Sequence, residues 1–147
     1  MAGLVTRQTV PAAATAVVRA RTTWPDFPTL WPSLLDEVWT CLRAAGITRG
    51  CPNVMLYRDE VPNVEVGVLL TRPCVLTGRV VESSLPAGSV ATALHRGPND
   101  RLGATHHAVV QWCDAQGCRP AGPRWEIYGP HRDDPELIEV RVAYLLT

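Results

Sequence analysis

Two stretches of the chain carry apolar residues at helical spacing. The first stripe, at spacing i, i+4, i+7 and i+11, consists of Trp31, Leu35, Val38 and Leu42. It predicts a helix that begins at about Thr29 or Ser33 and ends at Ala45, with Gly46 at the C′ position. The second stripe consists of Leu102, His106, Val109 and Cys113. It predicts a helix from roughly Asp100 or Leu102 to Gln116 that stops at Gly117.

Strand-like runs flank both predicted helices in the same order. Each helix follows one strand and precedes two more, with the runs near residues 16–21, 53–58, 64–70, 89–95, 124–129 and 138–146. A connection over residues 71–86 contains a short run, Arg79–Glu82, that adds a strand or extends the next one. This order predicts a tandem β-α-β-β arrangement.

A shift of 71 residues places the second half of the sequence on the first. Gly46 falls on Gly117, and every member of the first helical stripe falls on its counterpart in the second. Tyr57 falls on Tyr128, whereas Met55 falls on Glu126. A carboxylate at a duplicated position that is apolar in the other copy marks Glu126 as a candidate functional residue.

Neither repeat alone buries both faces of a three-stranded sheet. We therefore expect one α+β domain over residues 1–147, with pseudo-repeats at about 10–70 and 85–147. Its antiparallel sheet carries both helices on one face, and a ligand cleft lies at the pseudo-twofold axis.

Strand alternation assigns side chains to the two faces of this sheet. The more apolar set, expected under the helices, comprises Val54, Leu56, Trp125 and Ile127. The other face is expected to form a groove lined by Met55, Tyr57, Arg124, Glu126 and Tyr128. Trp39 and Trp112 lie slightly off the helical stripes, so they either pack in the core or reach the groove rim as ligand-binding residues. Tyrosine rings beside a carboxylate suit a small flat or cationic molecule.

Composition narrows the choice of partners. The formal net charge is zero and no basic run occurs, which argues against nucleic-acid binding. The chain lacks the run of about 20 apolar residues that a membrane span needs. Five scattered cysteines form no CxxC pair, which favours reduced thiols in a cytoplasmic protein. Exposed sheet edges are compatible with a monomer or a homodimer.

No common cofactor or nucleophile motif is present, so no cofactor is expected. His106 and His107 are adjacent and point about 100° apart on a helix, so no metal site is expected either. His106 itself lies on the core stripe and is interpreted as a hydrogen-bonded core or boundary residue. The segment His95–Asp100 is interpreted as a turn in which Asp100 caps the second helix.

Several short segments of the sequence resemble those of one known family. They are Leu85–Ala91, His95–Pro98 with Asp100–Gly103, Trp112 ahead of Gly117, Gly122–Tyr128 and Glu139–Val142. In this order and spacing they resemble the GyrI-like small-molecule-binding family, over about residues 10–147. The resemblance implies the tandem β-α-β-β fold with a ligand cleft at the pseudo-twofold axis.

The resemblance implies three alternatives for function. The first is a stand-alone protein that binds or sequesters an apolar or aromatic compound, including cationic ones, at Glu126. The second is a hydrolase that opens the cyclopropane rings of DNA-alkylating antibiotics, with Glu126 activating water and Tyr57 or Tyr128 donating a hydrogen bond. The third is a protein-binding inhibitor of DNA gyrase.

The chain departs from the family pattern at two positions. Asn99 stands where a tyrosine is usual after the Gly-Pro turn, and Arg141 stands where the last strand often has an aromatic residue. The last strands align separately, residues 64–70 with residues 138–144 at a shift of 74, and this alignment pairs Arg141 with Gly67. Arg141 is a candidate ligand-binding residue that is expected to approach Glu126 across the sheet. Such a pair would weaken selection for cationic ligands.

Overall fold

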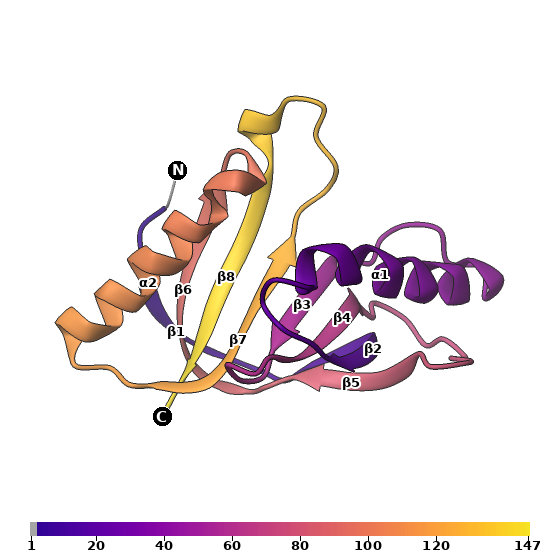
Figure 1. Cartoon of the computed structure of the whole chain (residues 1–147), viewed down its shortest axis with the longest axis horizontal. Coiled ribbons are helices and arrows are strands. Elements are labelled where there is room, and N and C mark those ends of the chain that lie inside the picture. Colours follow the sequence, from indigo (N-terminus) through magenta and orange to yellow (C-terminus); the bar gives the residue numbers. More distant parts are fainter. Residues whose placement is uncertain (1–2) are drawn as a thin grey trace. The chain divides into compact units, whose positions relative to one another are not determined.

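The structure, a computed structural model, describes residues 3–147. It divides into two compact units (Figure 1). The α1 unit is Ala12–Pro86, and the α2 unit is the described part of Met1–Pro11 together with Ala87–Thr147. The chain therefore starts in the α2 unit, builds the whole α1 unit, and then returns.

The α1 unit is a four-stranded antiparallel sheet with one helix. Its elements are β2 (Ala13–Arg21), α1 (Phe27–Ala44), β3 (Asn53–Tyr57), β4 (Asn63–Leu69) and β5 (Val81–Leu85). The strands lie in the order β3-β4-β2-β5. Helix α1 packs against β2 and β4.

The α2 unit repeats this plan. Its elements are β1 (Thr6–Val10), β6 (Gly88–Arg96), the 3-10 helix η1 (Asn99–Arg101), α2 (Leu102–Gln116), β7 (Pro120–Tyr128), η2 (Pro135–Leu137) and β8 (Glu139–Leu146). The strands lie in the order β7-β8-β6-β1. Helix α2 packs against β6 and β8, as Figure 1 shows.

The predicted α+β class and the tandem β-α-β-β order are confirmed. Each unit also has an outer strand that the repeat alone did not predict. In the α1 unit it is β5, which contains the end of the short Arg79–Glu82 run. In the α2 unit it is β1, whose polar residues are mostly exposed and gave little periodic signal. Within each unit the outer strand pairs with the strand that precedes the helix.

Helix α1 begins at Phe27, earlier than expected. Pro28 lies in the first turn, where the missing N–H would have had no helical acceptor. The predicted ends are correct: Gly46 and Gly117 take left-handed φ angles of 83° and 69° beyond the last turns. The predicted cap was wrong, because Asp100 lies inside η1 and helix α2 has no side-chain cap.

The core of the α2 unit lies between α2 and two strands. Leu102, Val109 and Cys113 pack against a set of buried residues from β6 and β8: Ala91, Ala93, Val140, Val142, Tyr144 and Leu146. Trp112 and Tyr128 lie at the edge of this cluster. The residues of β8 in the cluster alternate, so their parity identifies the face of the sheet that α2 covers.

Candidate functional site

Glu126 lies on the strand face that α2 covers, contrary to the expected face assignment. In the antiparallel register Glu126 pairs with Val142, and Tyr128 pairs with Val140. Directly opposed residues share a face, and both valines belong to the core under α2. Glu126 is accordingly buried, with 5% of its surface exposed. A buried carboxylate needs hydrogen-bond donors to offset the loss of water.

His106 supplies one of those donors from α2. Its Nε2 lies 2.6 Å from Glu126 Oε2. Its Nδ1 lies 2.8 Å from the Tyr144 hydroxyl, and the two rings meet edge to face. A carboxylate oxygen accepts, so the pattern assigns the Nε2 proton to this bond. The Tyr144 hydroxyl can donate or accept, so it satisfies Nδ1 in either protonation state of the ring.

Tyr128 supplies the second donor. Its hydroxyl donates to Glu126 Oε1 over 2.8 Å, and the two residues are two positions apart on one strand face. Burial, reinforced by the negative charge of Glu126, raises the pKa of Tyr128 far above its ordinary value. The phenol therefore stays protonated and remains a donor.

The result is a continuous hydrogen-bonded chain, Tyr144–His106–Glu126–Tyr128, which we call the polar network. It draws on β8, α2 and β7. Arg124, two residues before Glu126, places its guanidinium carbon 5.8 Å from the centre of the Tyr144 ring. A cation at this distance interacts favourably with the ring face.

Two members of the polar network replace apolar residues of the other repeat. Glu126 stands 71 positions after Met55, and His106 stands 71 positions after Leu35. Both replacements introduce an ionisable group, and the two new groups bond to each other. The two repeats therefore differ by a pair of residues, His106 and Glu126, that contact each other.

Met55 and Tyr57 also lie on a helix-covered face, and not in the uncovered groove that was expected. They pair with Val66 and Val64 of β4, and the Tyr57 ring packs edge to face with Phe27 of α1 at 5.4 Å. Both are buried, and the Tyr57 hydroxyl lies 3.7 Å from the Met55 sulfur. Val54 and Leu56 are buried too, but they point away from α1.

The two candidate rim tryptophans have separate surroundings. Trp39 donates from its indole N–H to the Asn53 side-chain oxygen over 2.8 Å within the α1 unit. Trp112 is half-buried at the edge of the core of the α2 unit.

The expectation that Arg141 approaches Glu126 was wrong. Arg141 is exposed and pairs in register with Leu94 and Ile127, whereas Glu126 pairs with Val142. Consecutive residues on a strand point to opposite faces, so Arg141 and Glu126 diverge. The repeat alignment of this strand was also displaced. Arg141 opposes Ile127 as Glu65 opposes Leu56, so its counterpart is Glu65 and not Gly67.

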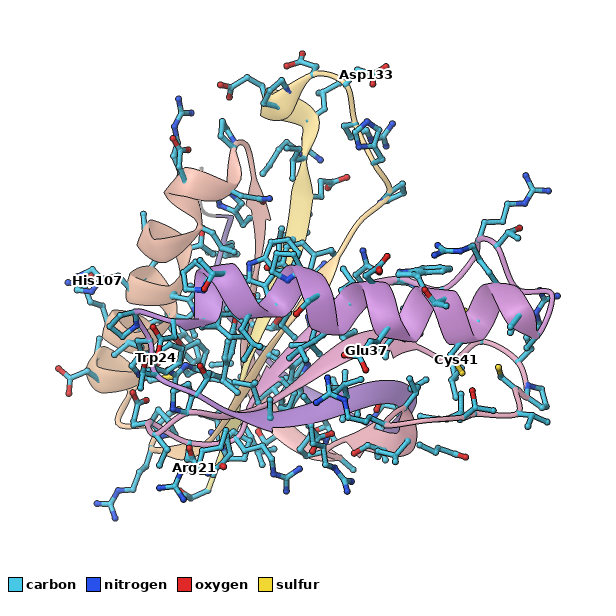
Figure 2. The ribbon with its side chains drawn as sticks, turned by 45° about the vertical axis from the view of Figure 1, so that its right-hand side comes forward. Arg21, Trp24, Glu37, Cys41, His107 and Asp133 are labelled. Carbon is cyan, nitrogen blue, oxygen red and sulfur yellow. The ribbon has the colours of Figure 1, made fainter. Side chains whose placement is uncertain are left out.

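Sequence reasoning had not placed His106 or Tyr144 in the site. The available signal was a histidine on an apolar stripe, at a position that is leucine in the other repeat. Its neighbour His107 is exposed and projects from the outer side of α2 (Figure 2). Tyr144 gave no signal of its own, because tyrosine is common in strands and often packs in the core.

A duplicated β-α-β-β fold, with the polar network buried under one helix, places the chain among small α+β domains. The chain belongs to the family described as the GyrI-like small molecule binding domain, whose model matches residues 5–145. No curated protein matches the chain.

Solved structures show the same fold at low identity. The EcmrR chain in a cryo-EM EcmrR–DNA complex has a TM-score of 0.76 at 19% identity, over 97% of this chain and 57% of that one. SAV2435 bound to tetraphenylphosphonium has a TM-score of 0.72 at 10% identity, over 98% and 94%. A hydrolase from Listeria innocua has a TM-score of 0.62 at 18% identity, over 97% and 91%.

This chain thus spans just over half the length of EcmrR in that complex. Within residues 3–147, neither helix has the length and apolar character needed to cross a membrane.

Proposed function

We propose that this chain binds and sequesters aromatic or apolar small molecules, including cations, with Glu126 as the residue that recognises positive charge. The observation that carries the proposal is the buried Glu126 carboxylate, held by His106 and Tyr128 at a repeat position that is otherwise methionine. A charge retained inside an apolar core costs stability, and binding a cation offsets part of that cost.

The surroundings of Glu126 favour aromatic ligands. Tyr128 bonds to the carboxylate, Tyr144 lies one hydrogen bond further along the polar network, and Trp112 lies at the edge of the same cluster. Rings stack on flat ligands and attract cations through their faces. SAV2435, which shares the fold, was solved with tetraphenylphosphonium, a cation that carries four phenyl groups. We extend to this chain the same ligand class. Met55, Tyr57 and Trp39 lie in the α1 unit, and their role in ligand binding stays a prediction from the sequence.

A pair of ligands matched in shape tests the proposal. Methyltriphenylphosphonium and triphenylphosphine oxide both carry three phenyl groups on phosphorus, but only the first is a cation. Titration followed by tryptophan fluorescence and calorimetry should give saturable binding of both, with the cation preferred. Glu126→Gln should lower affinity for the cation by about tenfold, the loss of one charge contact of roughly 1.4 kcal/mol, and leave the neutral ligand nearly unchanged.

Glu82→Gln is the matched control, because Glu82 is an exposed residue of β5. It removes the same charge from the protein and should alter neither affinity. Absence of saturable binding across a varied aromatic panel would overturn the proposal. An equal loss of both ligands in Glu126→Gln would instead assign Glu126 a structural role.

A hydrolase is the second candidate, and one observation favours it. The Tyr128 phenol, kept protonated by burial, sits 2.8 Å from the Glu126 carboxylate, so a proton donor and an acceptor stand together. A hydrolase from Listeria innocua shares the fold. Binding ranks first because both oxygens of Glu126 already accept hydrogen bonds from side chains of the protein, which leaves fewer lone pairs to accept from a water molecule.

Mass spectrometry separates the two candidates. A cyclopropane-bearing alkylator is incubated with the protein, and a hydrolase yields the water adduct with repeated turnover. Glu126→Gln should abolish that turnover, and Tyr128→Phe and Tyr57→Phe test the two candidate donors. Binding without turnover supports sequestration.

A further inference from the structure

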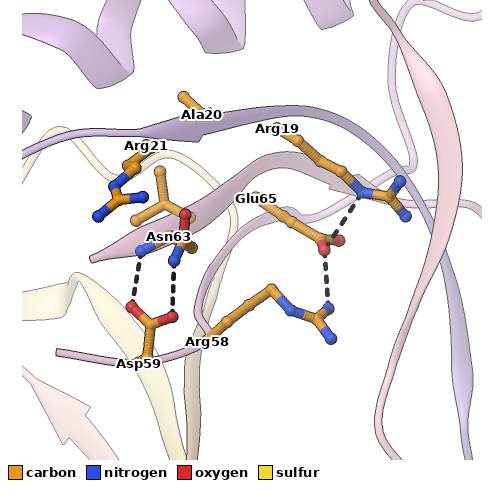
Figure 3. Close-up of a pocket in the computed structure, with 8 residues that line it drawn as sticks. Arg19, Ala20, Arg21, Arg58, Asp59, Asn63 and Glu65 are labelled. Carbon is orange, nitrogen blue, oxygen red and sulfur yellow. Dashed lines mark hydrogen bonds and ion pairs between the residues drawn. The ribbon is translucent and has the colours of Figure 1, made fainter. Parts of the chain in front are cut away.

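The α1 unit contains a surface pocket that the polar network does not use. It has a volume of about 470 Å³ and lies along β2, β4 and the turn before β4 (Figure 3). Three arginines and two carboxylates line it, together with an amide and two small apolar residues: Arg19, Arg21, Arg58, Asp59, Glu65, Asn63, Ala20 and Val64.

The strand register brings the charged side chains together. Arg19 and Arg21 are two residues apart on β2 and oppose Glu65 and Asn63 of β4. Arg58 follows the last residue of β3 and reaches the same carboxylate. Arg19 and Glu65 point away from α1, because their strand neighbours Val18 and Val66 form the opposite, helix-facing set.

Glu65 is the unusual member of this pocket. Only 1% of its surface is exposed, and its Oε2 meets Arg58 at 2.8 Å and Arg19 at 3.4 Å. Its other oxygen, Oε1, is buried without a hydrogen-bond partner among the described residues. A buried acceptor that lacks a donor is costly, and it indicates a missing partner.

The pocket also carries surplus positive charge. Asp59 is held by the backbone N–H groups of Val61 and Asn63 and by the Asn63 amide, and these bonds lower its pKa. The carboxylates of Asp59 and Glu65 each offset one positive charge. Three guanidinium groups line the pocket, so one positive charge is left without a carboxylate to offset it. No hydrogen bond of the Arg21 side chain is present in the part of the chain described, and Figure 3 shows it beside the Asp59–Asn63 pair.

We infer that this pocket binds a protonated phosphate, either inorganic hydrogen phosphate or a phosphate monoester. The planar donor forks of Arg19, Arg21 and Arg58 match the oxygens of a phosphate group. The P–OH group supplies the donor that Glu65 Oε1 lacks. Arg19 and Arg58 have side chains 60% and 52% exposed, so both guanidinium groups are open to a ligand that enters from solvent.

This arrangement predicts selection against sulfate. Sulfate has the same shape and the same acceptors, but it is fully deprotonated and has no hydrogen to offer Glu65. A carboxylate that faces it would repel it. The pocket volume leaves room for an organic group beside the phosphate, so a monoester is accommodated as well.

Calorimetry and ³¹P NMR with the full chain test the inference at pH 6, where all inorganic phosphate carries a P–OH group and about half of a phosphate monoester does. The probes are inorganic phosphate, glycerol 2-phosphate and sulfate. We expect phosphate to bind at least tenfold more tightly than sulfate, and Arg21→Gln to weaken phosphate by about tenfold, which corresponds to one charge-assisted contact. Arg132→Gln, an exposed arginine outside the pocket, is the matched control and should change nothing.

Glu65→Gln examines the selection itself. Its amide can donate to a sulfate oxygen, so the preference for phosphate should disappear. If this variant fails to fold, the Arg21→Gln result and the phosphate-to-sulfate ratio of the wild type decide. Equal binding of phosphate and sulfate, binding unchanged in Arg21→Gln, or no binding at millimolar concentration each overturns the inference. Tighter binding of glycerol 2-phosphate than of inorganic phosphate identifies a monoester as the ligand.

Discussion

His106 and Glu126 bond to each other across 2.6 Å, and each stands where the other repeat has an apolar residue. Their counterparts are Leu35 and Met55. A single replacement of this kind would bury an unpaired polar group, which costs about 1–3 kcal/mol. The pair avoids that cost, because each residue supplies the partner that the other needs.

This coupling predicts non-additive stability. His106→Leu and Glu126→Met restore the residues of the first repeat one at a time. Each single variant should lose about 1–3 kcal/mol of the free energy of unfolding, because it leaves a buried partner unsatisfied. The double variant should be at least about 1 kcal/mol more stable than the sum of the singles predicts. Urea unfolding of the four proteins measures this coupling energy.

His107→Leu provides the comparison on the same helix. His107 is exposed, so its replacement should change stability by no more than about 0.5 kcal/mol. Additive losses in the double variant would show that His106 and Glu126 contribute independently, in spite of their contact.

Tyr128 predicts a loss of stability at alkaline pH. The unfolded phenol has a pKa of about 10, and the folded pKa is raised above it. Between these values the unfolded state releases a proton that the folded state keeps, so alkali favours unfolding. Above about pH 10 this group should lower stability by up to about 1.4 kcal/mol per pH unit.

Comparison with Tyr128→Phe isolates that contribution. The chain has no lysine, so no amine side chain titrates in the same range, and the other tyrosines are common to both proteins. The difference in unfolding free energy between wild type and variant should be constant below pH 9 and should shift in favour of the variant above pH 10. Parallel curves throughout would contradict the raised pKa of Tyr128.

The sequence predicted the elements of the fold better than it predicted the faces of the sheet. Periodicity found both helices and six of the strands because a helix or strand imposes its own spacing. The face assignment failed because β3 is buried on both sides, so Val54 and Met55 give no polar contrast. The partner of Glu126 was missed because the His106–Glu126 contact joins a helix to a strand, and only tertiary packing brings them together.

Gly67 lies where β4 has no room for a side chain. A Cβ atom at this position would lie 1.9 Å from the Ala16 carbonyl oxygen in β2, closer than any van der Waals contact. Gly67→Ala must therefore separate two paired strands and should cost more than about 3 kcal/mol, or prevent folding. Gly103→Ala is the matched control, since its added methyl in α2 meets nothing within 4 Å. That control should gain roughly 0.5–1 kcal/mol from helix propensity, and a similar tolerance at Gly67 would contradict the close approach.

The buried contact between His95 and Thr105 is a second place in the α2 unit where a substitution should lower stability. Both side chains are fully buried; His95 Nδ1 lies 2.8 Å from the Thr105 hydroxyl, and its Nε2 lies 3.1 Å from the Pro98 carbonyl. The carbonyl only accepts, so Nε2 carries the proton and Nδ1 accepts from Thr105.

Thr105→Val preserves volume and removes that donor, and it should cost about 1–3 kcal/mol by leaving a buried nitrogen unsatisfied. Thr105→Ser keeps the hydroxyl and loses only a methyl group, about 0.8 kcal/mol of burial. The ¹⁵N chemical shift of Nδ1 should move in the valine variant and stay nearly constant in the serine variant. A shift that moves equally in both would mean that the Thr105 hydroxyl does not donate to His95.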